Sequence, residues 1–302
     1  MALAIGLIGG GTWGTTLMGL FQQTGHRVEL WRRSSGIAAL EPLQNCDLVV
    51  SAVAFAGVEG LAKQLSNWNR YPPLLSCSKG LDPGTGKTAS QIWQRYCPKM
   101  PIFVLSGPNL ATELAMGLPA ASVLAGTNDQ LLNKLQKELS SSHLRLYRNN
   151  DPVGTEVAGG LKNVIAIAAG VCDGLSLGAN ARASLLTRGL AEMGLVIQAL
   201  GGRPETLYGL AGLGDLLATA TSALSRNYRF GNSLAEGLST AAALERIAAT
   251  VEGVPTCAAL LCLAGDRAWN LPIATQVQEL IEGRIDPQKA IQKLMERQLR
   301  SE

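Results

Sequence analysis

The 302-residue sequence predicts an α/β protein with two parts: a doubly wound parallel sheet in residues 1–150 and an all-α domain in residues 151–302. Three observations predict this fold class. Apolar strand-like segments alternate with helix-like segments through the first half, which is the pattern of a mostly parallel sheet. A glycine-rich turn follows the first apolar segment directly. Strand signals then end near residue 150, and long segments rich in Ala, Leu and Gly with helical periodicity follow.

The glycine-rich turn has glycines at positions 9, 11 and 14, the G-x-G-x-x-G spacing, between an apolar run (residues 3–8) and a helix-like segment (residues 15–21). In a strand–turn–helix, Gly9 allows the tight turn, Gly11 lets a pyrophosphate approach the backbone, and Gly14 lets helix and strand pack closely. The phosphates then face the positive end of the helix. The turn therefore predicts a Rossmann-like dinucleotide site. The alternative is a glycine-rich turn of another α/β protein, since 34 glycines produce this spacing by chance.

The second predicted strand, residues 27–31, is followed by Arg32 and Arg33. Folds that bind NAD usually have an acidic residue here, which bonds the ribose 2′-hydroxyl. Two guanidinium groups instead suit the 2′-phosphate of NADP, which they can bind in bidentate fashion. The sequence therefore favours NADP as cofactor and leaves NAD open. The alternative is two solvated arginines after a strand.

The first half continues with the same alternation. We expect further strands at residues 47–53, 73–77, 102–105, 120–124 and 144–147, with helices at residues 57–68, 88–96, 111–116 and 129–139. Ligands of such sheets bind beyond the carboxyl ends of the strands. Lys79 and Gly107 stand just past two of these ends.

In the second half we expect helices at residues 153–172, 181–200 and 287–300, and Lys162 lies in the first of them. Its neighbours on the helix face are small and apolar, among them Gly159. Lys162 is therefore either an edge lysine whose stem snorkels or a desolvated amine with a lowered pKa, suited to general acid/base chemistry. We expect the adjacent glycines to let a ligand approach the helix backbone.

Two further groups of polar residues follow. Asp215 precedes an apolar run, so it is either a helix N-cap or a residue that orients a substrate hydroxyl or the lysine. The stretch at residues 225–231 brings together a hydroxyl, two guanidinium groups and an amide, from Ser225, Arg226, Arg229 and Asn227. This set suits an anionic group, phosphate especially. The alternative for this group is an N-cap followed by exposed arginines.

Composition excludes several classes of function. A net charge of +3 without a basic block gives no support for nucleic-acid or membrane-surface binding. The six cysteines form no C-x-x-C pair and the two histidines stand apart, so we expect neither a metal site nor a disulfide framework. The N-terminus has no signal-peptide pattern and the apolar runs are short. We therefore expect a soluble, cytoplasmic protein.

Taken together, these segments resemble the bacterial-type NAD(P)-dependent glycerol-3-phosphate dehydrogenases. The matching segments occur in the family's order at residues 9–15, 78–81, 105–108, 156–164, 212–216, 225–227 and 251–253. The combination of Gly-Leu-Lys-Asn, Gly-Leu-Gly-Asp and Ser-Arg-Asn is specific to this family. The segment at residues 34–46 departs from it, because the family usually has a longer stretch there.

The resemblance implies a role for each matching position. Lys162 corresponds to the proton donor and acceptor. The implied substrate-binding residues are Lys79, Gly107, Asn109, Lys162, Asp215, Ser225, Arg226 and Asn227. The implied cofactor-binding residues are Gly9, Gly11, Thr12, Trp13, Gly14, Arg32, Arg33, Lys79, Ala111, Arg226, Thr250 and Glu252.

The resemblance also implies the reaction: reversible, NAD(P)H-dependent reduction of dihydroxyacetone phosphate to sn-glycerol 3-phosphate, which supplies glycerophospholipid synthesis. Two rival hypotheses are a different two-domain NADP-dependent hydroxy-acid dehydrogenase and a non-catalytic NADP-sensing protein. The partner we expect is a small phosphorylated molecule. Oligomeric state does not follow from the sequence, and a homodimer remains open.

Overall fold

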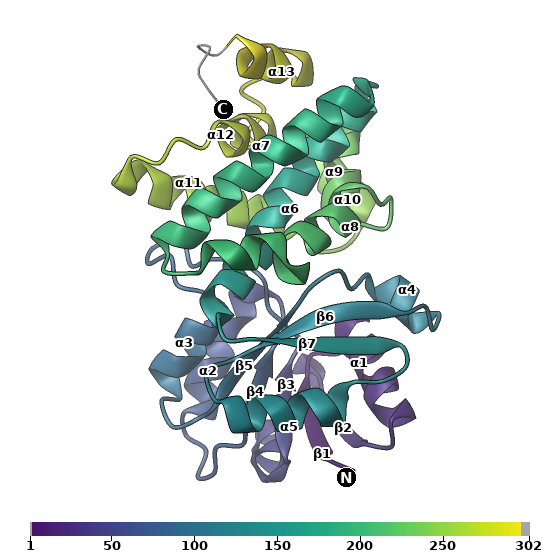
Figure 1. The fold of residues 1–302 in the computed structure, drawn as a ribbon, viewed down its shortest axis with the longest axis vertical. Helices are drawn as coiled ribbons and strands as arrows, with labels where there is room; N and C mark the ends of the chain where they lie inside the picture. Colours follow the sequence, from purple (N-terminus) through teal and green to yellow (C-terminus); the bar gives the residue numbers. More distant parts are fainter. Residues whose placement is uncertain (1, 297–302) are drawn as a thin grey trace.

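The computed structural model describes residues 2–296 and has a seven-stranded sheet in its first half (Figure 1). The order of the strands is β2-β1-β3-β4-β5-β6-β7. All neighbours are parallel except β5 and β6, which are antiparallel. The strands are β1 (Ala4–Ile8), β2 (Arg27–Trp31), β3 (Leu48–Ser51), β4 (Leu74–Ser76), β5 (Ile102–Ser106), β6 (Ala120–Ala125) and β7 (Leu144–Asn149). The predicted, mostly parallel sheet is confirmed.

Helices cover both faces of the sheet, as a doubly wound fold requires. Apolar side chains of α1 (Thr12–Gln23), α4 (Ala111–Ala115) and α5 (Asp129–Leu139) form a core with one face. Those of α2 (Val58–Leu65), α3 (Ala89–Tyr96) and the 3₁₀ helix η2 (Ile37–Asn45) form a core with the other. Burial on both faces explains why the strands are continuous apolar runs. The short 3₁₀ helices η1 (Arg33–Ser35) and η3 (Phe55–Gly57) complete this half.

The glycine-rich turn has the geometry expected of it. Gly9 has φ +115°, a conformation that favours glycine. A Cβ at Gly14 would lie 1.9 Å from the Gly9 carbonyl oxygen, so α1 packs onto the turn only without a side chain there. A Cβ at Gly11 would meet nothing within 4 Å, so this position is open to a ligand. Helix α1 begins at Thr12, three residues earlier than expected, because Gly11 already acts as its N-cap.

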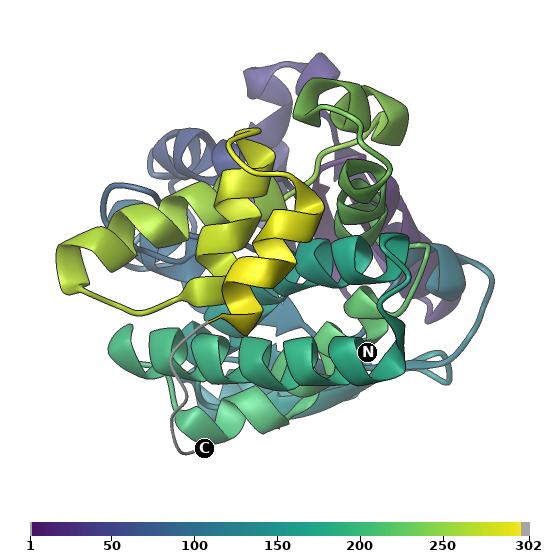
Figure 2. The same cartoon turned by 90° about the horizontal axis from the view of Figure 1, so that it is seen from above.

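The second half is all helical, as predicted, and lies over the sheet (Figures 1 and 2). Its α-helices are α6 (Pro152–Gly174), α7 (Gly178–Ala199), α8 (Asp215–Ala220), α9 (Arg226–Ala235), α10 (Thr240–Ile247), α11 (Gly253–Arg267), α12 (Pro272–Ile281) and α13 (Pro287–Met295). The 3₁₀ helix η4 (Pro204–Tyr208) and the π-helical turn η5 (Leu210–Gly214) precede α8. Residues 297–300 of the predicted last helix lie outside the described residues.

Helix α6 is the centre of this half. It is long and apolar enough to cross a membrane, but 89% of its most apolar window is buried inside the protein, so it is a core helix. Asp151 anchors its start: one carboxylate oxygen accepts the Gly154 N–H at 2.8 Å, and the other accepts the Arg203 N–H at 2.8 Å and the Thr206 hydroxyl at 2.7 Å. The start of α6 is thereby tied to the segment that follows α7.

Glycines allow α6 and α9 to touch through their backbones. A Cβ at Gly231 of α9 would lie 1.9 Å from the Ile167 carbonyl oxygen, and one at Gly170 of α6 would lie 2.0 Å from the Tyr228 carbonyl oxygen. Backbone atoms cannot give way as a flexible side chain does. The two helices are therefore held at a separation that only glycine permits.

We predict that Gly231→Ala lowers the free energy of unfolding by about 1–3 kcal/mol or more, because α9 must move off α6. The matched control is Gly265→Ala in α11, where a Cβ would meet nothing within 4 Å. That change should raise stability by roughly 0.5–1 kcal/mol through helix propensity. Urea unfolding of both variants measures the difference, and equal effects would contradict the close contact.

Candidate active site

A cavity of about 540 Å³ lies between the carboxyl ends of the strands and the helices of the second half. It brings together most of the positions singled out in the sequence. From the first half these are Gly11, Thr12, Trp13, Lys79, Asn109 and Ala111. From the second half they are Lys162, Ser225, Arg226, Asn227, Thr250 and Glu252.

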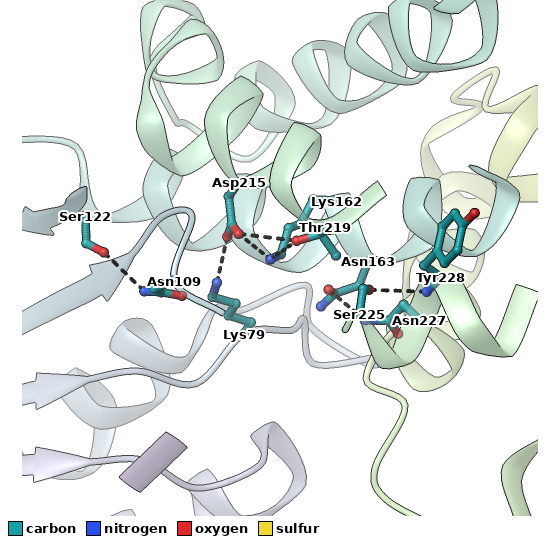
Figure 3. A network of polar contacts seen from close by, with 10 residues as sticks. All are labelled: Lys79, Asn109, Ser122, Lys162, Asn163, Asp215, Thr219, Ser225, Asn227 and Tyr228. Atoms are coloured by element: carbon teal, nitrogen blue, oxygen red, sulfur yellow. Dashed lines mark hydrogen bonds and ion pairs between the residues drawn. The ribbon is translucent and has the colours of Figure 1, made fainter. Parts of the chain in front are cut away.

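The charged centre of this site is Asp215, which stands between two lysines (Figure 3). The Lys79 Nζ donates to Asp215 Oδ2 at 2.6 Å. The Lys162 Nζ forms an ion pair with the other oxygen, Oδ1, and donates to the Thr219 hydroxyl at 2.6 Å. Lys79 follows β4 in the first half, whereas the other three residues belong to α6 and α8. The triad of Lys79, Asp215 and Lys162 therefore joins the two halves at the cavity.

Lys162 is a desolvated amine and not an edge lysine, since only 7% of the residue is exposed. Its pKa is lowered from 10.5 to about 7, mainly by burial and in smaller part by the positive charge of Lys79. The carboxylate of Asp215 acts in the opposite direction and keeps the ammonium form accessible. An amine with a pKa near neutrality can both give and take a proton.

Asp215 is not the helix N-cap that one interpretation proposed. The N-cap of α8 is Gly214, and Asp215 is the first helical residue. The π-helical turn η5 precedes it, and a Cβ at Gly212 within that turn would lie 2.0 Å from the Leu207 carbonyl oxygen. This tight turn directs the buried carboxylate of Asp215 toward the lysines. The interpretation in which Asp215 orients the lysine agrees with these contacts.

The glycines beside Lys162 have a different use from the one expected. A Cβ at Gly159 would lie 2.6 Å from Ser106 Oγ and 3.4 Å from Lys79 Cδ. A Cβ at Gly160 would lie 3.2 Å from the Gly80 backbone nitrogen. The expectation that a ligand approaches the helix here is therefore wrong. The end of β5 and the segment that follows β4 occupy this side of α6, and this close packing brings Lys79 beside Asp215.

The group Ser225, Arg226 and Asn227 forms the start of α9 on one wall of the cavity. Ser225 is the N-cap, as the alternative interpretation held, since its hydroxyl accepts the Tyr228 N–H at 3.2 Å. The Asn227 amide donates to Asn163 Oδ1 at 2.9 Å and accepts the Gly253 N–H at 2.9 Å. Arg226 is exposed to the cavity. This wall of the cavity thus combines two hydrogen-bonded side chains, Ser225 and Asn227, with the positive charge of Arg226.

Two predicted substrate positions lie past β5. Asn109 lines the cavity and donates from Nδ2 to Ser122 Oγ at 3.3 Å. Gly107 is not among the residues that line it. Its φ of +140° and the 3.0 Å between a Cβ and the Ser122 Cα show that only glycine fits this turn.

The cofactor positions divide into two groups. Thr12, Trp13 and Ala111 line the cavity from the first half, and Thr250 and Glu252 line it from the second. Burial raises the pKa of Glu252, while the Arg226 guanidinium and a hydrogen bond with the Phe55 backbone lower it. The predicted residues Arg32 and Arg33 are exposed and do not line the cavity.

Arg32 nevertheless lies at the glycine turn. A Cβ at Gly10 would come within 2.5 Å of Arg32 Nε, so the guanidinium stem passes directly over the turn. No side chain caps α1, and its first turn holds no acidic residue. The open position at Gly11, these uncapped amides and the nearby cation fit the phosphates of a dinucleotide.

Sequence reasoning missed one residue of the site, Thr219. Thr219 bonds both Lys162 and, at 3.4 Å, Asp215 Oδ1. Its signal was the spacing of four from Asp215, which places both on one helix face. Arg229, the second guanidinium of the predicted anion-binding cluster, lines the cavity three residues after Arg226. Among residues 2–296, no group of three or more His, Cys, Asp or Glu side chains could hold a metal ion.

Known proteins share both the sequence and the fold. The models for the N-terminus and C-terminus of NAD-dependent glycerol-3-phosphate dehydrogenase match residues 37–132 and 151–292. Glycerol-3-phosphate dehydrogenase [NAD(P)+] from Synechococcus sp. (strain RCC307) is 60% identical over all 302 residues, which is the full length of both chains. The enzyme of the same name from Synechococcus sp. (strain JA-2-3B'a(2-13)) is 48% identical over 99% of this chain and 96% of its own.

Among solved structures, glycerol-3-phosphate dehydrogenase from Coxiella burnetii has a TM-score of 0.91 and 34% identity, with 98% of this chain and 99% of that chain covered. The family models together span most of the sequence, and the relatives align along nearly its full length. The chain therefore belongs to the NAD(P)-dependent glycerol-3-phosphate dehydrogenase family.

Proposed function

We propose that this protein reduces dihydroxyacetone phosphate to sn-glycerol 3-phosphate with NAD(P)H, reversibly, and so supplies glycerophospholipid synthesis. The observation that carries the proposal is the Lys79–Asp215–Lys162 triad, whose two lysines line one cavity with Gly11 of the glycine turn and the cationic start of α9. The names of its relatives support the same reaction. We place the enzyme in the cytoplasm, with no nucleic-acid or membrane partner. The boundary between its two domains is placed between residues 150 and 151. A homodimer is left open.

In this proposal Lys162 moves the proton. The cofactor, when bound, supplies or accepts the hydride at the substrate C2. As the carbonyl oxygen becomes an alkoxide, the Lys162 ammonium donates a proton to it and stabilises its charge beforehand. Asp215 and Thr219 hold the Lys162 Nζ in place. In the oxidation direction the neutral amine takes the proton back.

The remaining proposed substrate residues position the reacting carbon. Arg226, together with Ser225 and Asn227, holds the phosphate. Asn227 is already bonded on both sides, so we propose that it fixes the wall of this subsite as well. Lys79, Asp215 and Asn109 lie at the hydroxyl and carbonyl end, and Gly107 forms the turn that precedes Asn109.

The proposed cofactor site runs along the first half. Gly9, Gly11 and Gly14 shape the turn beneath the pyrophosphate, and Thr12, Trp13 and Ala111 line the cavity beside it. Arg32 and Arg33 bind the 2′-phosphate of NADP, with NAD as the second cofactor. Lys79, Arg226, Thr250 and Glu252 complete the site from the cavity side.

One assay separates the proposed reaction from its rivals. We expect NADPH oxidation with dihydroxyacetone phosphate and none with a panel of 2-keto acids, because the cavity holds a phosphate-binding cation beside the lysine. Turnover with a keto acid instead would indicate a hydroxy-acid dehydrogenase. NADPH binding without turnover of any of these substrates would indicate a sensor.

In the same assay, Lys162→Ala should lower kcat by roughly 100-fold or more, because the reaction loses its proton donor. NADPH binding, measured by fluorescence titration, should stay nearly unchanged, which shows that the variant is folded. Turnover close to that of the wild type would exclude Lys162 as the proton donor.

Because burial sets the pKa of Lys162 near 7, the two directions should respond to pH oppositely. Reduction needs the ammonium form and should fall as pH rises through about 7. Oxidation needs the neutral amine and should rise through the same range. Lys79→Met removes a charge that lowers this pKa, so both midpoints should move to higher pH. Profiles of kcat/KM measure the midpoints, and unmoved midpoints would contradict the coupling.

Replacing Arg32 and Arg33 with Gln should weaken NADPH binding by about tenfold or more and leave NADH binding nearly unchanged, because only NADPH carries the 2′-phosphate. Arg27→Gln is the matched control, since this exposed arginine lies at the opposite end of β2. The dissociation constants of NADPH and NADH, measured for the wild type and both variants, test this prediction. Equal weakening of NADPH and NADH would count against recognition of the 2′-phosphate.

A further inference from the structure

Glu156 is a buried carboxylate that the proposed mechanism does not use. It lies in the second turn of α6 and is only 1% exposed. Its side chain contacts the other half of the protein: Oε1 accepts the Ser90 N–H at 2.8 Å, and Oε2 accepts the Ser90 hydroxyl. Ser90 is the second residue of α3. Glu156 therefore links the central helix of one half to the start of a helix in the other.

Helix α3 already has a cap of its own. Thr88 and Gln91 form a capping box, in which each side chain bonds the other residue's backbone. The N–H of Ser90 is one of the first-turn amides that this box does not bond, and Glu156 accepts it. The contact has an energetic cost, since burial raises the pKa of Glu156 from 4.5 to about 7. A surface cap would avoid that cost, so its place at the interface needs another reason.

The segment between β4 and α3, residues 77–88, explains the position of Glu156. Lys79 near its start is bonded to Asp215, and Ser90 just beyond its end is bonded to Glu156. Between these ties, Gly80 lies against Gly160 of α6, and the buried Leu81 belongs to the apolar core of the second half. The segment is thus held at both ends and pressed onto α6 between them.

We propose that Glu156 is a positioning residue that holds segment 77–88 against α6 and thereby sets the place of Lys79 relative to Lys162. Glu156 and Lys162 belong to one continuous helix, about 9 Å apart along its axis at 1.5 Å per residue. A rigid helix therefore carries both the anchor for the segment and the proposed proton donor. This inference rests on the proposed function of Lys162 and Lys79.

The proposed action is mechanical and not electrostatic. The groups that shift the pKa of Lys162 are Asp215 and Lys79, together with burial, and Glu156 is not among them. An isosteric amide should therefore replace the carboxylate. The oxygen of a glutamine at 156 can accept the Ser90 N–H, and its NH₂ can donate to the Ser90 hydroxyl.

The test compares Glu156→Ala and Glu156→Gln with the matched control Glu192→Ala. Glu192 of α7 also accepts two backbone N–H groups at a helix start, those of Ile273 at 2.6 Å and Ala274 at 3.2 Å. That helix, α12, does not contribute to the cavity. Loss of Glu192 thus removes a comparable helix cap without touching segment 77–88.

For Glu156→Ala we expect kcat with dihydroxyacetone phosphate to fall by about tenfold or more, since misplacing a catalytic group by an ångström is enough for such a loss. Amide hydrogen exchange in residues 77–90 should become faster. Glu156→Gln should keep kcat within about threefold and leave the pH midpoint unmoved. Both alanine variants should lower the thermal midpoint of unfolding to a similar extent, because each loses a helix cap. In Glu192→Ala, however, kcat and hydrogen exchange in residues 77–90 should stay unchanged.

Three results would overturn the proposal: unchanged kcat and exchange in Glu156→Ala, an equal loss of kcat in Glu192→Ala, or a moved pH midpoint in Glu156→Gln. If Glu156→Ala does not fold, Ser90→Ala takes its place, because it removes only the hydroxyl donor. It should lower kcat and speed exchange in residues 77–90 by smaller amounts. If neither quantity changes, the positioning role of Glu156 is refuted. A wild type inactive on dihydroxyacetone phosphate would refute the proposed function instead, and exchange in residues 77–90 would still test the anchor.

Discussion

The buried carboxylate of Asp215 is the constraint around which the rest of this structure is arranged. An ionised group that is 1% exposed must be paired, because an unpaired charge in such a place costs several kcal/mol. Asp215 takes one lysine from each half, Lys79 at 2.6 Å and Lys162 through its other oxygen. The pairing is possible only when α6 lies directly over the strand ends. The docking of the two halves and the chemistry of the cavity thus depend on the same contacts.

Glycine makes this docking possible. Gly159 and Gly160 remove the side chains that would keep Ser106, Lys79 and Gly80 away from α6. The same device recurs at Gly14, where α1 meets the turn, and at Gly231, where α9 meets α6. In each case the obstacle to a Cβ is backbone or a side chain held in place by its own contacts, which leaves little freedom to adjust. The number of glycines in the sequence therefore reflects close contacts between elements as much as flexible turns.

Much of the fold could be predicted from the sequence, because strand–helix alternation and the change in character near residue 150 are local patterns. Local patterns also identified Lys162, but they left two interpretations that only its burial separates. The use of Gly159 was assigned wrongly, because the segments that press on it come from strands about 50 and 80 residues earlier. Glu156 gave no signal, since its partner Ser90 lies 66 residues away in the chain. Periodicity and spacing in the sequence therefore do not predict the contacts between the two halves.

The charge balance of the triad agrees with the reaction proposed for it. Two lysines face one carboxylate, so the buried group carries an excess positive charge when both are protonated. In a site shielded from water such a charge acts strongly on an anion or a developing alkoxide. Burial is the main reason why the pKa of Lys162 falls toward neutrality. The positive charge of Lys79 lowers this pKa as well, and the carboxylate of Asp215 raises it. Burial and the charge of Lys79 together thus outweigh the effect of Asp215 and bring the pKa of Lys162 to about 7, which suits the reversible proton transfer proposed for this lysine.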